Sequence, residues 1–495
     1  MLERISEKNI SGYINRVVIS IGVLYITMPI VIFAFGWLRI VYAIPFSVAI
    51  IAMSIRLIID LSERVKIDLF NRKTIVYWII CIAVVALWVF YSGIGGFSFQ
   101  NDDYWFREPV YRDLITYDWP VFYNSQKETG LVYYFSYWLI PAFFSKAKTF
   151  LFGGEGEYFG RLMLYFYSVL GILVVVFFLN VFLEKCSYGT VILLIMFSGL
   201  DAIPYGIINA KIPITISHME WWAGYFQYSS NTTQLYWVFN QSIPIWIICG
   251  ILLLLYENPR CILALISLGF AYSTWAIFGL LPLGLYGFFK GGLTKLINLY
   301  NIMIPGMMML FYGSFYISSA LQSTGSIGLL LIGNDWNVVL LRYLLFILLE
   351  VYAYILICRN ISSAPFYWLV VVMLTVFPVI IVIDKNFSMR ASIPPLFFLM
   401  VYVLIFLERY DAQGHRFGRL RKAILICMLC IGSLTPISEI GRSIYKTSCG
   451  VPYEYIKIDS LADINSTDVK NYLVYAKDLT TISKNSFFYS YLMKR

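Results

Sequence analysis

The chain has 495 residues, 60% of them apolar, but only 37 Lys or Arg and 28 Asp or Glu residues. A soluble interior cannot bury this much apolar surface, and uncharged runs of about twenty residues recur along the chain, so a soluble enzyme, a disordered protein and a disulfide scaffold are excluded. The formal net charge of +9 comes from short basic clusters between the apolar runs. Such clusters are typical of membrane topology signals, so we expect no nucleic-acid partner.

The apolar runs predict an all-α polytopic membrane protein with about 13 transmembrane helices. The first run is too long for a signal peptide and lacks a small-residue cleavage site, so we interpret it as a retained anchor. The two spans within 261–289 are short, and they form either two crossings or a re-entrant hairpin. The predicted spans are 17–38, 40–59, 75–96, 162–183, 188–207, 240–256, 261–274, 275–289, 296–317, 337–358, 364–383, 391–408 and 423–438.

The basic clusters indicate the orientation, because Lys and Arg concentrate in cytoplasmic loops. A cytoplasmic N-terminus places all the strong clusters inside: those at 64–73, 290–295 and 409–422. The same parity places two long segments outside, 97–161 and 208–239. It also predicts two parts of the chain, a membrane domain over 1–440 and a small extracytoplasmic C-terminal tail over 441–495.

The first outer segment opens with paired carboxylates, Asp102 and Asp103, directly after the third span. Arg107, Arg112 and several aromatic residues follow in the sequence DDYWFREPVYRD. Carboxylates at this depth lie beside the lipid headgroups, where they can act on a group carried by a lipid. A solvated loop with an interfacial aromatic belt is the alternative interpretation.

The rest of this segment, from Leu131 to Arg161, is apolar but is interrupted by Pro141, Lys146, Lys148 and a Gly-Gly pair. This pattern favours interfacial helices followed by a turn over another complete span. An additional span would also invert every later loop and place two basic clusters outside, against the charge rule.

The order of these features resembles the polytopic glycosyltransferases of the GT-C type, which use polyprenyl-phosphate-linked sugars. The resembling features are an acidic pair opening the first outer loop, a Pro- and aromatic-rich stretch ending in Gly, and an Arg at the start of the next span. The phage-type O-antigen glucosyltransferases of bacteria look similar in size. The resemblance implies that Asp103 or Asp102 serves the acceptor as base, and it implies a bacterial inner or plasma membrane. The chain departs from the pattern because two spans precede the loop-bearing one, where one is usual.

The second outer segment is rich in side chains that suit carbohydrate, because aromatic rings stack on sugar C–H faces while amides and carboxylates bond hydroxyls. An aromatic belt explains the rings equally well. A His beside a Glu is more often structural than catalytic. The candidate residues are His218, Glu220, Trp221, Trp222, Gln227 and Tyr228.

Three cations are candidates for holding a lipid phosphate: Lys385 and Arg390 at the start of the twelfth span, and Arg342 near the outer end of the tenth. A departing phosphate needs compensating charge, whereas interfacial snorkelling is the structural alternative. Glu350 lies deep within its span, so we expect it to be protonated or paired with a group on another helix, with a proton pathway as the functional alternative.

These features predict an inverting transfer of a sugar from polyprenyl phosphate, undecaprenyl phosphate in bacteria, to a glycan or lipid-linked acceptor on the outer membrane face. A divalent cation, Mg or Mn, is a possible cofactor, as in some GT-C enzymes, although no Cys/His pattern indicates a metal site. Two alternatives stay open. One is a lipid-linked sugar flippase or transporter, and the other is an O-antigen-type polymerase or ligase.

Overall fold

The structure is a computed structural model that describes most of the chain. The described residues are 2–123, 129–210, 218–256, 260–291, 297–320, 327–329, 336–358, 365–382, 386–409, 416–452, 459–462, 480–482 and 486–494. Lys385 lies outside these residues, so its predicted role is not addressed by the structure.

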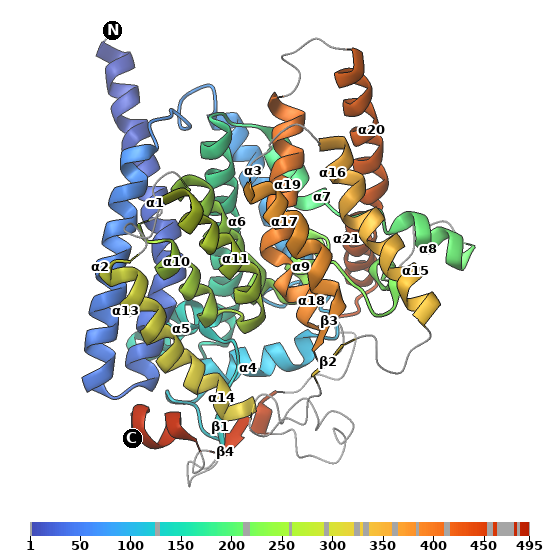
Figure 1. The fold of residues 1–495 in the computed structure, drawn as a ribbon. Coiled ribbons are helices and arrows are strands. Elements are labelled where there is room, and N and C mark those ends of the chain that lie inside the picture. Colours follow the sequence, from blue (N-terminus) through green and yellow to red (C-terminus); the bar gives the residue numbers. More distant parts are fainter. Residues whose placement is uncertain are drawn as a thin grey trace.

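The described chain is predominantly helical, and most of its helices run along one common direction (Figure 1). The helices are α1 (Leu2–Trp37), α2 (Ile40–Arg64), α3 (Ile75–Tyr91), α4 (Tyr104–Thr116), α5 (Leu139–Phe152), α6 (Glu157–Leu183), α7 (Tyr188–Met196), α8 (Ala202–Asn209), α9 (Asn231–Leu255), α10 (Ile262–Leu268), α11 (Thr274–Gly291), α13 (Leu299–Met308), α14 (Ser314–Ala320), α15 (Trp336–Ile347), α16 (Ala353–Cys358), α17 (Pro365–Val376), α18 (Asn386–Ala391), α19 (Ile393–Arg409), α20 (Arg416–Gly432) and α21 (Leu434–Ser448).

Six stretches of helix are long and apolar enough to cross a membrane: Ser11–Trp37, Ile40–Arg64, Glu157–Leu183, Asn231–Leu255, Asn337–Cys358 and Gly418–Ser448. Five shorter apolar helices accompany them. The outward faces are also apolar, and α2 exposes Ile44, Val48, Ile51, Ile55 and Ile59 at helical spacing. This much exposed hydrocarbon suits lipid rather than water. The predicted helical, membrane-embedded class is therefore supported, while the number of about 13 spans stays a prediction.

The predicted pair of short spans within 261–289 forms α10 and α11, which are joined through a 3-10 turn at Gly269–Ala271. An ideal Cβ on Gly284 of α11 would lie 3.4 Å from the Ile262 side chain of α10. The two helices therefore fold back on each other as a helical hairpin.

The predicted span over 188–207 is wrong as a continuous helix. Helix α7 ends at Met196, and Phe197 is extended with φ −71° and ψ 125°. The backbone at Gly199 is covered by the Glu350 carboxyl group, so that any side chain at Gly199 would collide with it. The break lets this buried carboxyl approach the main chain, and the helix resumes as α8 after Asp201.

The second predicted outer segment, 208–239, is also too long, because α9 starts at Asn231 and not near 240. The Ser230 side chain caps this helix by accepting a hydrogen bond from the Thr233 backbone N–H. The first nine residues of α9 are polar enough to suggest a loop. They are nevertheless mostly buried, and residues within this turn, such as Thr232 and Thr233, use their hydroxyls in internal hydrogen bonds.

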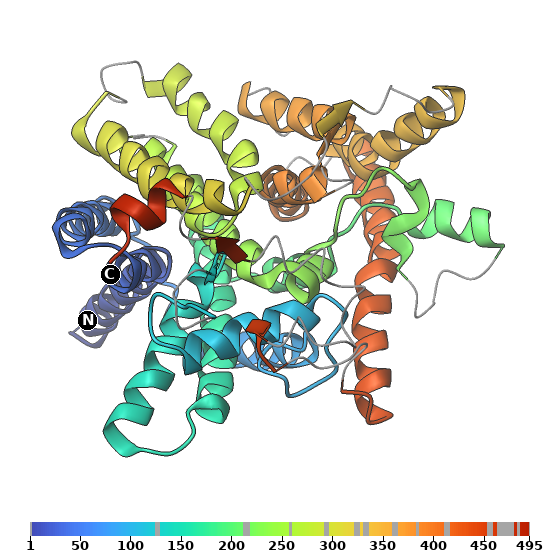
Figure 2. The ribbon, with the colours of Figure 1, turned by 90° about the horizontal axis from the view of Figure 1, so that it is seen from below.

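Helix α4, the two strand pairs and the C-terminal residues gather at one end of the bundle, called the α4 end below, and the N-terminus lies at the other (Figure 1). Strand β1 (Thr129–Leu131) pairs antiparallel with β4 (Thr480–Ile482), and β2 (Ile327–Leu329) with β3 (Ile380–Val382). Seen from this end, α4 lies across the bundle (Figure 2). The predicted helices of the first outer segment are thus present as α4 and α5.

The C-terminal tail packs on the α4 end. Gly130 of β1 is opposite Thr481 of β4, the Leu461 N–H donates to Asp113 Oδ2 at 3.0 Å, and Arg39 donates to the Ser490 carbonyl at 2.9 Å. Because α21 runs through residue 440, the tail begins after Ser448 and not at 441.

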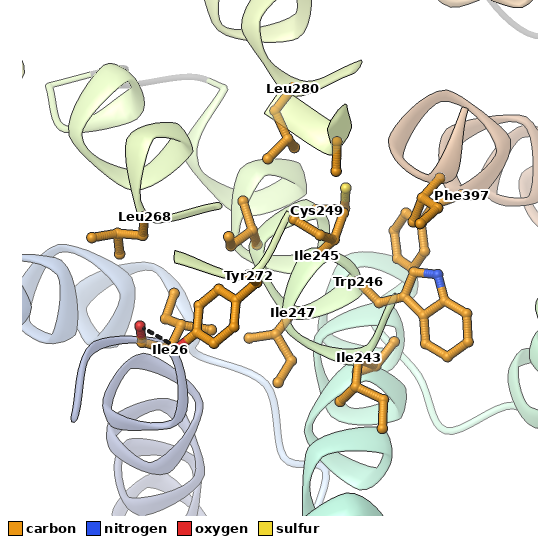
Figure 3. Close-up of a cluster of buried hydrophobic side chains, with 14 of the residues drawn as sticks. Ile26, Ile243, Ile245, Trp246, Ile247, Cys249, Leu268, Tyr272, Leu280 and Phe397 are labelled. Carbon is orange, nitrogen blue, oxygen red and sulfur yellow. Dashed lines mark hydrogen bonds between the residues drawn. The ribbon is translucent and has the colours of Figure 1, made fainter. Parts of the chain in front are cut away.

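Helix α9 forms the centre of the core, since 89% of its most apolar stretch is buried. A helix that is apolar on all sides must be enclosed by other helices. Side chains from α1, α10, α11 and α19 surround it, including Ile26, Leu268, Leu280 and Phe397, and the nearby Tyr272 hydroxyl donates to the Ile26 carbonyl at 2.8 Å (Figure 3).

Close packing of α6 against its neighbours depends on Gly171, where an added Cβ would collide with the Tyr25 hydroxyl and lie 2.6 Å from Ile243 Cγ2. We therefore expect Gly171→Ala to destabilise the protein by about 1–3 kcal/mol through overpacking. The measurement is thermal unfolding of the purified protein. Gly306→Ala, where nothing lies within 4 Å of the added Cβ, is the control and should not lower the unfolding temperature. Equal unfolding temperatures of the two variants would contradict the close packing at Gly171.

Candidate functional site

The start of α4 is fixed to α9 by one asparagine. Asn101 Nδ2 donates to the Tyr236 carbonyl of α9 at 2.9 Å, and its Oδ1 accepts from the Asp103 N–H at 3.1 Å. Asn101 is buried, so its amide holds the acidic pair in one place relative to the central helix.

Asp103 forms an ion pair with Arg107, one helical turn later. Arg107 Nη2 lies 2.6 Å from Asp103 Oδ2, and the Arg107 side chain is 1% exposed, whereas that of Asp103 is 27% exposed. The guanidinium also lies 5.4 Å from the Phe106 ring centroid. Within the described chain, Nε and Nη1 of Arg107 form no hydrogen bond of good geometry. Tyr133 hydrogen-bonds the guanidinium as well, which offsets part of the cost of burying a cation with so many donors.

A second cation, Arg390 of α18, joins this group. Its Nη1 donates to Asn386 Oδ1 at 2.5 Å. Burial lowers the pKa of Arg390, while the nearby charge of Asp103 partly opposes that effect. Burial also disfavours the charge on Arg107, but Asp103 and Tyr133 outweigh it and raise the pKa of Arg107. The structure thus brings Arg390 to Asp103, although 286 positions of sequence separate them.

We call Asp103, Arg107, Arg390 and their neighbour Tyr133 the Arg107 cluster. The Arg107 guanidinium is paired with Asp103, the Arg390 guanidinium is near enough to feel the charge of Asp103, and Asp102 is in a partly buried position. The Tyr134 hydroxyl is hydrogen-bonded to Thr274 Oγ1 at 2.6 Å, which holds this stretch against α11. The two cations can bind a phosphate group, and the part-exposed Asp103 can accept a proton from a hydroxyl.

Arg112 is not part of this cluster. It donates to Glu157 at 2.8 Å and to Asp459 at 2.6 Å, and so it connects α4 with α6 and the C-terminal tail. Its predicted role in substrate binding has no support in these contacts, because both partners are carboxylates of the protein.

The second predicted group of residues forms a separate, largely internal network. His218 Nδ1 lies 2.9 Å from Glu439 Oε1, and Arg442 bonds both residues, at 2.7 Å each. The Trp237 indole donates to Glu439 Oε2 at 3.2 Å. His218 therefore pairs with an acidic residue of α21, not with its sequence neighbour Glu220, and this ion network holds α21 against α9.

Glu220 is buried among hydrogen-bond donors. Its carboxylate accepts from Thr233 Oγ1 at 2.6 Å, from the Ser230 N–H at 2.9 Å and from Gln227 Nε2 at 3.1 Å. Burial nevertheless raises the pKa of Glu220 to about 8, and the charge of Asp201 adds to the rise. At neutral pH the protein thus holds a proton on Glu220.

Glu350 has the partner on another element that its sequence position requires. Its carboxyl group hydrogen-bonds that of Asp201, and Asp201 also accepts from the Trp222 indole at 2.9 Å. Two buried carboxyl groups in contact favour sharing one proton. Asp201, Glu220 and Glu350 thus form one buried acidic group.

Several predicted sugar-binding residues use their polar atoms inside the protein. Tyr228 donates to the Leu374 carbonyl at 2.5 Å, Gln227 contacts Glu220, and Trp222 contacts Asp201. Trp221 is 50% exposed. Arg342 is exposed and lies beside Gly224, with 3.1 Å between its Nη1 and an ideal Cβ there. The structure therefore places Arg342 with this second network and not with the Arg107 cluster.

A divalent metal does not fit the Arg107 cluster, because two guanidinium groups lie where positive charge would be added. Among the described residues no group of three or more His, Cys, Asp or Glu side chains is arranged to hold a metal ion. We therefore assign no step to Mg or Mn.

Sequence reasoning did not single out Tyr133, Tyr134 and Asn386. Tyr133 and Tyr134 lie in the apolar stretch LVYYF, where the only signal was two adjacent tyrosines that an interfacial belt explains equally well. No protein-family model matches the chain, and no curated protein or solved structure is significantly similar to it.

The proton on Glu220 makes stability depend on pH. The pKa of a Glu side chain in an unfolded chain is about 4.3. Between that pH and about 8 the folded state therefore binds more protons than the unfolded state. Stability should therefore fall as pH rises through this window. We expect the unfolding temperature of Glu220→Gln to fall less between pH 5 and 9 than that of the wild type. Glu155→Gln, at an exposed position, should behave like the wild type. An unchanged pH profile in Glu220→Gln would contradict the assignment.

Proposed function

We propose that the chain is a membrane glycosyltransferase that moves a sugar from a polyprenyl-phosphate carrier to a glycan or lipid-linked acceptor on the outer face of the membrane. The observation that carries this proposal is the Arg107 cluster. It combines the buried guanidinium of Arg107, the partly buried guanidinium of Arg390 and a part-exposed carboxylate.

The proposed reaction is a direct displacement. Asp103, or its neighbour Asp102, takes the proton of an acceptor hydroxyl, whose oxygen then attacks the anomeric carbon of the sugar. The bond from that carbon to the phosphate oxygen breaks, and its electron pair stays on the phosphate. Arg107 and Arg390 stabilise this developing charge, which is greater in the transition state than in the bound donor. Lys385 remains a proposed third cation.

Two features support this arrangement. Burial makes each cation more effective, because charge interactions are stronger where water is excluded. The acceptor base and the phosphate-binding cations also converge from α4 and α18, which lie far apart in the sequence but together at the α4 end.

A lipid-linked sugar transporter is the second candidate, and one specific observation favours it. Asp201, Glu220 and Glu350 are buried together, burial raises the pKa of Glu220 to about 8, and buried acids inside membrane proteins often form proton pathways. In that case the Arg107 cluster would bind the lipid phosphate without bond cleavage. An O-antigen-type polymerase or ligase would carry out the same transfer reaction as the proposed glycosyltransferase but would use a different acceptor.

The base is tested by Asp103→Asn in purified protein incubated with a panel of polyprenyl-phosphate sugars and acceptors. We expect donor consumption to fall by about 100-fold or more, as for loss of a general base. Asp60→Asn is the matched control, because Asp60 forms the same type of pair with Arg56, four residues apart at 3.0 Å, and it should keep full activity.

Activity that is unchanged in both Asp103→Asn and Asp102→Asn would contradict the assignment of the base. Consumption of no donor by the wild type, together with movement of the labelled lipid across vesicles, would favour transport. Thermal unfolding of each variant separates lost chemistry from lost folding.

The phosphate-binding cation is tested by Arg390→Gln. We expect kcat to fall by about 10- to 100-fold, because a charge-assisted contact to the leaving phosphate is lost. Arg112→Gln should retain kcat, since the partners of Arg112 in the described chain are the Glu157 carboxylate and the carboxylate and carbonyl of Asp459. Equal losses in the two variants would indicate a general structural effect.

A further inference from the structure

A groove of about 560 Å³ lies between the last turns of α1 and the helix α5. Val31, Ile32 and Phe35 line it from α1, and Phe143 and Phe150 line it from α5, with Trp119 between them. Apart from two lysines its lining side chains are apolar, and it shares no residue with the Arg107 cluster.

The groove opens to the surroundings of the protein. Phe35 is 46% exposed, Phe143 48% and Phe150 89%. In a membrane-embedded protein, phenylalanines this exposed at the end of an apolar helix contact lipid chains.

The two lysines, Lys146 of α5 and Lys494 of the C-terminal residues, lie on the same groove. Lys146 Nζ lies 5.8 Å from the Trp119 ring centroid, and Lys494 Nζ donates to the Phe35 carbonyl at 3.3 Å. Partial burial lowers the pKa of each lysine, and the charge of Asp118 opposes that effect. In the described chain neither ammonium group forms an ion pair with a carboxylate within 4 Å.

Charge and shape together indicate the occupant. Two ammonium groups and the exposed Asp118 leave one positive charge, which a single phosphodiester neutralises. The apolar lining accepts a hydrocarbon chain, and a volume in the range of small-ligand pockets fits one acyl chain.

We propose that this groove binds one anionic glycerophospholipid, with its phosphate at Lys146 and Lys494 and an acyl chain along α1 and α5. The site is separate from the proposed transfer reaction and does not depend on it. Because it joins α1, α5 and the C-terminal residues, the lipid stabilises the packing of the tail on the α4 end.

The test is native mass spectrometry of protein reconstituted with equal amounts of phosphatidylglycerol and phosphatidylcholine and then released into detergent. We expect the wild type to retain one phosphatidylglycerol in preference to phosphatidylcholine. The double variant Lys146→Gln/Lys494→Gln should retain about tenfold less, because each lysine near an anionic headgroup contributes to binding. Lys148→Gln is the control, since Lys148 Nζ donates to the Gly153 and Glu155 carbonyls, away from the groove.

A second variant, Ala147→Trp, fills the groove without removing a charge, and it should also lose the lipid while its unfolding temperature shows that it folds. Equal retention of phosphatidylglycerol by the wild type and either variant would overturn the site. Equal retention of the two phospholipids would overturn the role of the lysines. Displacement by undecaprenyl phosphate at equal concentration would show that the carrier, and not a phospholipid, occupies the groove.

Discussion

The buried guanidinium of Arg107 is the constraint on which the α4 end depends. Removing a cation from water is costly unless charge and hydrogen bonds compensate it. Asp103 supplies one compensating charge, 2.6 Å away, and Tyr133 adds a hydrogen bond. Arg390 adds a second, partly buried cation near the same carboxylate. Two cations beside one carboxylate leave a net positive charge, and this charge is the basis of the proposal that a phosphate group binds here.

The first turns of α9 separate two networks with different roles. On one side the Tyr236 carbonyl accepts from Asn101, which positions the acidic pair. On the other side Trp237 donates to Glu439 of the His218 network, which holds α21. Non-helical dihedral angles at Val238 mark a kink directly after these two residues. One short stretch of the central helix therefore positions the residues of the proposed reaction and also holds α21 in place. The C-terminal tail is held instead by Arg112 and Asp113 of α4.

The sequence predicted well what depends on local patterns. Long apolar runs gave the helices, and the pair Asp103 and Arg107, four residues apart, could be expected to meet on α4. Contacts over long distances could not be predicted. Nothing in the sequence pairs His218 with Glu439, or brings Arg390 and not Arg342 to Asp103. The break at Gly199 was missed because the group packed against it, the Glu350 carboxyl, is about 150 residues away, and a hydropathy window detects only neighbours. The early start of α9 was missed because its polar residues satisfy each other when buried.

The most direct measurement is the structure of the protein determined with polyprenyl monophosphate bound. The proposal predicts that the phosphate oxygens lie about 3 Å from the guanidinium nitrogens of Arg107 and Arg390, with the Asp103 carboxylate close to the position of an acceptor hydroxyl. A phosphate bound elsewhere, with no phosphate oxygen in contact with Arg107 or Arg390, would contradict it.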